Sequence, residues 1–428
     1  MAQAGIDVHV ARGGDGTIRV AAGPVVNRAE DGSDAVAVGS GFTGAVLDVA
    51  GAVLVWPVLG ELGLPVAEVH DAGRAQQWLW AVYGERTAAA VHACAAGEPT
   101  GVRVTAGMTA LAGGAARLGF GHWASRWWPA SYEDGIPALE PDVLGLELAA
   151  LTHRCQQLFD DFGDQPDDCV AELIEEHQAA LDPLIQWWRA APQPADTARH
   201  LESVLRLIDD AADSAGLDGA ALRRLRSSLD QRRPAGAPVG PGALFARRDG
   251  YALAAGEPLL AGGRVIARGS GTNDWRRYPP GFVDASEHAV SWTARALGAR
   301  RRIEVEVVAH VGAPAGGAPL VAEVRVNGGQ SDRVFLARRD DMWTGRADLD
   351  LHLSAGAMPP HFEVGVLLPG FDPGPGPEGR EDRDAIRALV RRRLATAVQP
   401  LAYDASPHDA SSGLFLAEIA AAATGEDY

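Results

Sequence analysis

A segment rich in Pro and Gly at residues 234–243 separates two parts of the chain with different hydrophobic periods. Before it, apolar residues recur at intervals of three and four, which is typical of amphipathic helices. After it, apolar and polar residues alternate, as around Ile303, Val305 and Val307, which indicates strands with one buried face. Because one segment cannot satisfy both periods, the chain is expected to be multidomain α+β.

Eight short alternating segments after this linker are predicted strands, with Gly, Asn and Asp turns between them. They are Gly250–Ala254, Gly263–Arg268, Ala289–Arg295, Arg302–Ala309, Leu320–Val326, Asp332–Ala337, Trp343–Leu349 and Phe362–Leu368. This pattern favours an antiparallel β-sandwich over residues 244–371. A second Pro and Gly segment at 372–379 leads to a helical tail over 380–428, with helices predicted at 381–397 and 412–423. The last helix is expected to pack on its own chain.

Residues 132–233 form the acidic part of the chain, with 21 acidic residues against 9 arginines. Apolar stripes there predict four helices, at residues 141–164, 168–190, 196–215 and 218–231. Short loops join them, so we expect an antiparallel bundle, with Pro183 kinking the second helix. The net charge of −18 on the whole chain argues against binding to nucleic acid or to an anionic membrane.

The first part, residues 1–131, reads as an α/β domain. A hairpin is predicted over 5–27, helices over 73–96 and 107–127, and a strand over 102–105 between them. Strand and helix therefore alternate, which favours α/β.

Glycines at three positions in this part match a dinucleotide-binding pattern. Gly39, Gly41 and Gly44 follow a strand-like run, and such glycines let a backbone approach a pyrophosphate at a helix N-terminus. The alternative is chance, because 51 of the 428 residues are glycine. Trp56-Pro57 would also interrupt the helix that the motif needs. We keep a nucleotide site at these glycines as a hypothesis.

Two Asp-Asp-x-x-Asp clusters form a second candidate site. This pattern resembles the magnesium–diphosphate motif of isoprenoid synthases, in which carboxylates one helical turn apart bind hard cations. The candidate metal ligands are Asp160, Asp161 and Asp164, with Asp209, Asp210 and Asp213. The alternative is a pair of solvated helix ends in an acidic region, which the composition favours.

The composition excludes several chemistries. All 38 basic residues are arginine, so a Walker A loop, a pyridoxal-phosphate Schiff base and a Ser-x-x-Lys hydrolase are ruled out. Three widely spaced cysteines and the lack of a basic, then apolar, leader indicate reduced thiols in a cytoplasmic protein with no membrane association. No local pattern marks a nucleophile, so no catalytic residue and no cofactor is predicted.

Two stretches rich in Trp and Pro carry a family resemblance. One runs from Gly121-His122-Trp123 through Trp127-Trp128-Pro129 to Ile136 and on into Leu151-Thr152; the other comprises residues 275–292 and Trp343–Arg346. They are similar to an uncharacterised group in GC-rich bacteria that is encoded beside MoxR-type AAA+ ATPases and von Willebrand A-domain proteins. The resemblance covers about a quarter of the chain and implies an accessory or recognition component of a conflict or stress system, with those two proteins as partners.

The sequence thus favours a non-enzymatic interaction protein. A nucleotide-binding protein that uses the loop from Gly39 to Gly44 is one alternative, and it needs a helix N-terminus after the glycines. A magnesium-dependent diphosphate enzyme is the other, and it needs both acidic clusters to face one cavity.

Overall fold

The computed structural model describes residues 6–22, 41–60, 63–97, 102–159, 166–190, 195–231, 241–245, 264–298, 300–310, 313, 320–349, 360–371, 379–398 and 413–424. The chain divides into two compact units. Unit 1 comprises Met1–Trp128, Leu139–Ala246 and Arg391–Tyr428; unit 2 comprises Pro129–Ala138 and Arg247–Val390. The four domains expected from the sequence are a different division and stay a prediction. Helices and strands are mixed, with two antiparallel sheets over the described residues, so the α+β class is confirmed.

Unit 1 begins with a six-stranded sheet, in the order β3-β4-β5-β2-β1-β6. Its strands are β1 (Ile6–Arg12), β2 (Ile18–Ala22), β3 (Gly44–Val49), β4 (Ala52–Pro57), β5 (Val66–Val69) and β6 (Val102–Ala106). All its pairings are antiparallel, so the expectation of an α/β domain is wrong. The reason is local: β1–β2 and β3–β4 are hairpins, and a tight turn reverses the chain where an α/β unit would place a crossover helix.

Gly51 makes the β3–β4 hairpin possible. Its φ is +71°, and a Cβ there would lie 2.3 Å from the carbonyl oxygen of Asp71. That close approach lets the Gly51 carbonyl accept hydrogen bonds from the backbone N–H groups of His70 and Asp71, both at 3.0 Å. The Asp71 side chain in turn caps the first helix by accepting from Gly73 N and Arg74 N. One glycine therefore positions both a hairpin and the start of a helix.

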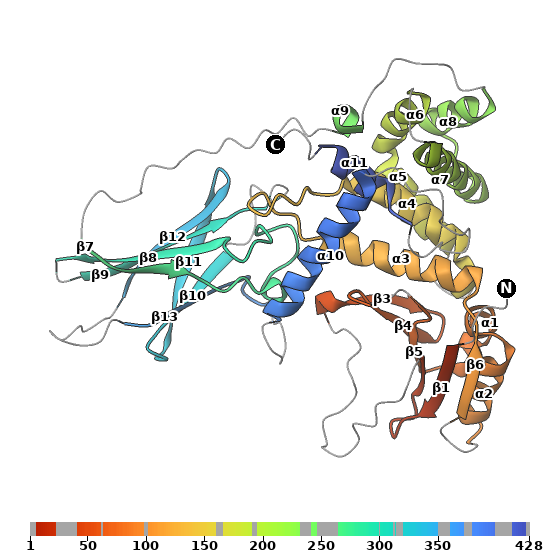
Figure 1. Cartoon of the computed structure of the whole chain (residues 1–428), viewed down its shortest axis with the longest axis horizontal. Coiled ribbons are helices and arrows are strands. Elements are labelled where there is room, and N and C mark those ends of the chain that lie inside the picture. Colours follow the sequence, from red (N-terminus) through yellow and green to blue (C-terminus); the bar gives the residue numbers. More distant parts are fainter. Residues whose placement is uncertain are drawn as a thin grey trace. The chain divides into compact units, whose positions relative to one another are not determined.

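Three helices accompany this sheet: α1 (Ala72–Tyr83), α2 (Glu85–Ala95) and α3 (Ala110–Trp127). The helix predicted over 73–96 is two helices, because Gly84 adopts a φ of +87° between them. α2 contacts β1, β2 and β6, and α3 contacts β3 and β4 (Figure 1). Buried tryptophans tie these layers together, since the Trp78 indole donates to Ala50 O at 2.8 Å and the Trp123 indole to Phe42 O at 2.7 Å.

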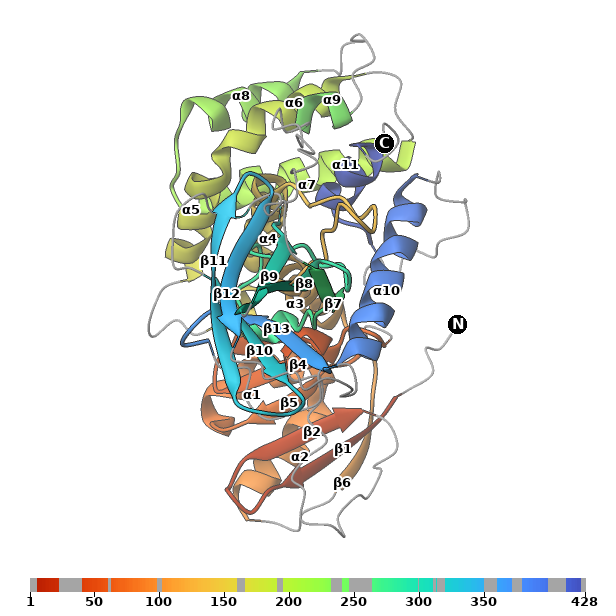
Figure 2. The ribbon, with the colours of Figure 1, turned by 90° about the vertical axis from the view of Figure 1, so that its left-hand side faces the viewer.

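The acidic stretch is helical as predicted, but the helix predicted over 141–164 ends at Arg154 and is followed by a 3-10 turn. Its helices are α4 (Pro141–Arg154), α5 (Pro166–His177), α6 (Leu181–Arg189), α7 (Ala195–Ser214) and α8 (Ala220–Asp230), with short 3-10 turns η2 (Gln156–Leu158) and η3 (Gln178–Ala180). The segment predicted as one kinked helix over 168–190 is interrupted at η3, and Pro183 lies in the first turn of α6, where its missing N–H costs no helical hydrogen bond. Both ribbon views show these helices gathered together (Figures 1 and 2).

Two later helices complete unit 1. α9 (Pro241–Phe245) and α11 (Leu416–Thr424) contact each other, and α11 also contacts α4, so the expected packing of the last helix on its own chain is confirmed. α10 (Arg380–Val398) begins in unit 2 and ends in unit 1. Over the described residues, no helix combines the length and the apolar character needed to cross a bilayer.

Unit 2 is built on a seven-stranded antiparallel sheet, in the order β13-β10-β11-β12-β9-β8-β7 (Figure 2). Its strands are β7 (Arg264–Ser270), β8 (Val290–Leu297), β9 (Arg300–Val308), β10 (Leu320–Val326), β11 (Ser331–Arg339), β12 (Met342–Leu349) and β13 (Phe362–Leu367). Seven of the eight predicted strands are found; the eighth, Gly250–Ala254, lies outside the described residues.

The predicted β-sandwich is wrong, because these strands form one sheet that curls on itself. Thr272, just after β7, donates its N–H to Val364 O of β13 at 2.7 Å, so the two edges of the sheet meet. The core lies inside the curl, where Ile303, Val305 and Val307 are fully buried. Alternation specifies one buried face, and both a sandwich and a curled sheet satisfy it.

Candidate functional site

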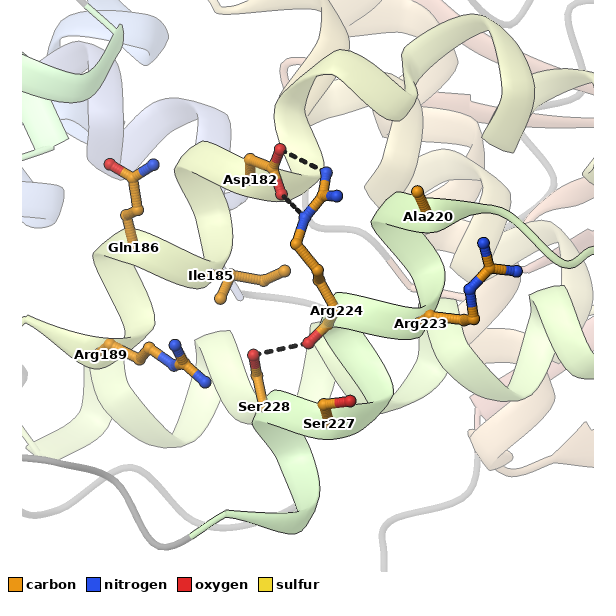
Figure 3. A pocket seen from close by; sticks show the side chains of 9 residues that line it. All are labelled: Asp182, Ile185, Gln186, Arg189, Ala220, Arg223, Arg224, Ser227 and Ser228. Atoms are coloured by element: carbon orange, nitrogen blue, oxygen red, sulfur yellow. Dashed lines mark hydrogen bonds and ion pairs between the residues drawn. The ribbon is translucent and has the colours of Figure 1, made fainter.

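A groove between α6 and α8 in unit 1 is the candidate site (Figure 3). It is open to solvent, with a volume of about 600 Å³. The residues that line it recur at intervals of three and four on both helices: Asp182, Ile185, Gln186 and Arg189 on α6, and Ala220, Arg223, Arg224, Ser227 and Ser228 on α8. This spacing places each set on one helical face. The groove is therefore the meeting of two polar stripes in the acidic part of the chain.

Arg224 spans the groove to reach Asp182. Its Nε donates to Asp182 Oδ1 at 2.9 Å and its Nη2 to Asp182 Oδ2 at 2.7 Å, a bidentate pair that Figure 3 shows as two dashed lines. The hydrogen bond to Asp182 raises the pKa of the Arg224 guanidinium. Both side chains are about half exposed, at 55% and 47%. Such exposed pairs contribute about 0–1 kcal/mol, so this one can exchange for a ligand carboxylate at little cost.

Arg223 and Arg189 differ in their partners. Arg223 pairs with Asp218 at 2.9 Å on the exposed side of α8 and points away from α6 in Figure 3. Arg189 extends from α6 toward the serines of α8, where its Nη2 makes one long hydrogen bond, 3.4 Å, to Gln231 Oε1. Its Nε is buried and has no hydrogen-bond partner. Of these three arginines, Arg189 is the one without a carboxylate partner.

The floor and rim of the groove add few further polar groups. Ile185 is 6% exposed and forms an apolar floor. The Ser228 hydroxyl donates to the carbonyl oxygen of Arg224 at 2.6 Å, so its proton is used inside α8. The groove thus offers guanidinium groups and a small apolar surface, which suit an acidic ligand with some apolar contact.

The glycine loop ends in a strand. Gly39 lies outside the described residues, Gly41 begins the 3-10 turn η1 (Gly41–Thr43), and Gly44 is the first residue of β3. A dinucleotide-binding motif holds the pyrophosphate at the N-terminus of the helix that follows its glycines. Here the segment that follows is a hairpin strand, so the described part of this loop presents no helix N-terminus. Nucleotide binding by these glycines stays a prediction.

The acidic clusters are only partly described. Asp160, Asp161 and Asp164 lie outside the described residues. Asp209, Asp210 and Asp213 lie near the end of α7, where Arg226 of α8 contacts Asp209 at 2.8 Å and Asp213 at 3.5 Å. Within the described ranges, no group of three or more His, Cys, Asp or Glu could hold a metal ion. In the structure Arg226 pairs with two aspartates of the second cluster, and magnesium binding by either cluster stays a prediction.

Buried charges in unit 1 hold the helices together. Glu147 of α4 is 2% exposed and lies 3.4 Å from Arg117 Nη2 and 3.5 Å from His200 Nε2. Glu418 of α11 is fully buried, pairs with Arg393 Nε at 2.6 Å and accepts from Phe415 N at 2.8 Å. Buried carboxylates with such partners are structural anchors for α11 and α4.

A second buried network holds the segment 129–138 in unit 2. The Asp284 carboxylate accepts hydrogen bonds from Ser131 Oγ at 2.7 Å, Tyr132 N at 2.7 Å and Ser286 N at 2.9 Å. Burial raises the pKa of Asp284, and these hydrogen bonds oppose that rise. Glu287, nearby in sequence, receives Arg383 Nε at 2.5 Å. These polar groups have their hydrogen-bond and ion-pair partners within the fold, so we assign them a structural role.

Two buried side chains, Cys155 and Tyr278, are poor nucleophiles. Burial raises the pKa of the Cys155 thiol to about 12, which leaves it protonated at neutral pH. Burial also raises the pKa of Tyr278, whose hydroxyl donates a hydrogen bond to Asn273 Oδ1.

Comparisons with protein-family models, curated proteins and solved structures find no match for this chain.

Proposed function

We propose that this protein is a non-enzymatic interaction component that docks an acidic segment of a partner protein in the α6–α8 groove. The observation that carries the proposal is the concentration of Arg189, Arg223 and Arg224 around one open groove. The surrounding region has 21 acidic residues against 9 arginines, so a cluster of three guanidinium groups there stands out from its background.

The ion pairs in the groove favour exchange with a partner. Arg224 and Arg223 are held by exposed aspartates, and exposed pairs are weak and easily replaced. A partner carboxylate can take the place of Asp182 or Asp218 without leaving a buried charge unpaired. The groove therefore offers recognition and orientation more than high affinity.

The resemblance described above suggests the identity of the partners. We propose a MoxR-type AAA+ ATPase and a von Willebrand A-domain protein, with this chain as the accessory member of a conflict or stress system in the cytoplasm. The expected acidic segment then belongs to one of these two proteins.

Affinity purification of the tagged full chain from its native cell, followed by mass spectrometry, tests the proposal. We expect the ATPase or the A-domain protein to co-purify in stoichiometric amount with the wild type and to be lost with the double variant Arg189→Glu and Arg224→Glu. The matched control is Arg206→Glu, an exposed arginine of α7 paired with Glu202 outside the groove. A wild-type preparation without either partner would overturn the proposal, as would equal recovery with the double variant.

A further inference from the structure

We infer that the Nε–Nη2 edge of Arg189 is a carboxylate-binding subsite and that the Gln231 amide oxygen occupies it in the absence of ligand. The ligand is a glutamate or aspartate side chain of an acidic peptide segment. The inference rests on the proposed docking function, because it names the group by which the groove recognises its partner.

Arg224, on the facing helix of the groove, shows how the Nε–Nη2 edge of an arginine binds a carboxylate. Arg224 uses the same two atoms, Nε and Nη2, to hold both oxygens of Asp182 at 2.9 and 2.7 Å. This side-on geometry matches the spacing of two carboxylate oxygens. The two arginines lie on facing helices of one groove, so they provide a direct internal comparison.

The corresponding edge of Arg189 is underused. Its Nη2 has only Gln231 Oε1 at 3.4 Å, and its Nε is shielded from solvent without any hydrogen-bond partner. A buried guanidinium N–H without an acceptor is unfavourable, because it has lost water and gained nothing in return. One amide oxygen can satisfy at most one of the two donors well, whereas a carboxylate satisfies both.

Gln231 is suited to give way. It is exposed and lies at the C-cap of α8, outside the regular helix. Moving its side chain breaks a single long hydrogen bond between two partly solvated groups. Ile185 lies one helical turn before Arg189 in the same groove lining, so it offers the aliphatic part of a glutamate side chain an apolar surface to pack on.

The single guanidinium selects a monoanion. The three arginines of the groove and the two aspartates that pair with them carry a net charge of +1, whichever carboxylate contacts Arg223 and Arg224. A phosphate dianion would face Asp182 with only one uncompensated cation to bind it, whereas one carboxylate balances that charge.

The test is fluorescence anisotropy with fluorescein-labelled hexaglutamate, the full-length chain and four single variants. Arg189→Gln is expected to weaken binding by about tenfold or more, the usual effect of losing a charge-assisted bidentate contact. Gln231→Glu, nearly isosteric, is expected to weaken it by a similar factor because it supplies an internal carboxylate to the same edge. Gln231→Ala is expected to bind at least as tightly as the wild type. The control, Arg206→Gln, removes one positive charge from α7 outside the groove and is expected to change affinity by less than about threefold.

Three outcomes would overturn the subsite. Equal losses with Arg189→Gln and Arg206→Gln would mean general charge attraction. Unchanged binding with Gln231→Glu would mean that the Nε–Nη2 edge is not the contact. Stronger competition by inorganic phosphate than by glutarate would exclude a carboxylate ligand. Absence of hexaglutamate binding would also overturn it. If the partner still co-purified through the groove, the docking function would stand without the subsite. If hexaglutamate bound as expected and no partner were found, the carboxylate subsite would stand without the docking function.

Discussion

Two carboxylates on the outer face of β9 are poorly matched to their surroundings. Glu304 and Glu306 lie two positions apart, so both side chains leave the strand on the same side. Glu304 is 8% exposed, and its Oε1 is buried without a hydrogen-bond partner. Burial, and then the charge of Glu304, raise the pKa of Glu306. The folded protein therefore disfavours the charge on Glu306.

Replacing Glu306 by Gln should stabilise unit 2. A raised pKa in the folded state means that the folded protein binds the proton more tightly than the unfolded chain, so ionisation of Glu306 destabilises the fold as pH rises above the usual range of a glutamate. Because Glu306 is only partly buried, solvent screens its charge, and we expect Glu306→Gln to gain at most about 0.5–1 kcal/mol at pH 7 and little at pH 4. Urea denaturation at the two pH values measures this. Glu363→Gln, at an exposed side chain of β13, is the control. Equal stability of Glu306→Gln and wild type at pH 7 would contradict the expectation.

The candidate site itself could have been found from the sequence only in part. Arg189 and Asp182 are seven positions apart on one helix, and Arg224 and Ser228 four apart on another, so each stripe is visible in the spacing. That the two stripes face each other depends on how α6 and α8 pack, which periodicity does not encode. The glycines at 39–44 and the aspartates at 160–164 drew attention because they match known motifs, whereas arginine spacing matches none.

At the scale of helices, two glycines on α3 provide a sharp comparison. A Cβ at Gly121 would lie 2.5 Å from Leu148 Cδ2 and 3.0 Å from Phe415 Cζ, while a Cβ at Gly113 would meet nothing within 4 Å. Gly121 is thus the position where α3 admits Leu148 of α4 and Phe415, the residue before α11.

Gly121→Ala and Gly113→Ala should therefore move stability in opposite directions. We expect Gly121→Ala to destabilise by about 1–3 kcal/mol through overpacking. Gly113→Ala should stabilise by about 0.5–1 kcal/mol, because alanine loses less conformational freedom in a helix. Thermal unfolding followed by tryptophan fluorescence reports both. A gain with both variants would show that Phe415 is not held tightly against α3.

Element types were largely predictable, and their partners were not. The stripes at 141–154 and 195–214 fix helices because their period is local, and the alternation at 303–307 fixes a strand in the same way. Whether strands pair through hairpins or crossovers, and whether a sheet curls or faces another, depends on contacts far apart in sequence. The α/β and sandwich expectations failed there, at Gly51 and at Thr272, where single turns and edge contacts decide the topology.

At the scale of the whole molecule, the net charge of −18 opposes the approach of any acidic ligand. This repulsion acts over a Debye length of about 30 Å at 0.01 M salt, whereas a contact ion pair in the groove acts over a few ångströms. We expect the affinity for hexaglutamate to rise from 0.01 M to about 0.1 M salt and to fall toward 1 M, where the Debye length is about 3 Å. Anisotropy titrations across this range test whether the affinity has a maximum. An affinity that falls steadily with salt would mean that attraction by the groove exceeds the repulsion by the whole chain at every salt concentration.

The docking of α11 on α4 has a consequence for biosynthesis. Arg117 Nη2 donates to Leu414 O at 3.1 Å across a separation of 297 residues, and Glu147 contacts Ala417 N at 3.4 Å. A ribosome adding about 5–20 residues per second makes the first of these groups many seconds before the last. During that interval the surface around Gly121 and Glu147 is not yet covered by Phe415 and α11. Nascent chains halted before residue 414 are therefore expected to expose an aggregation-prone apolar surface and to depend on chaperones until translation resumes.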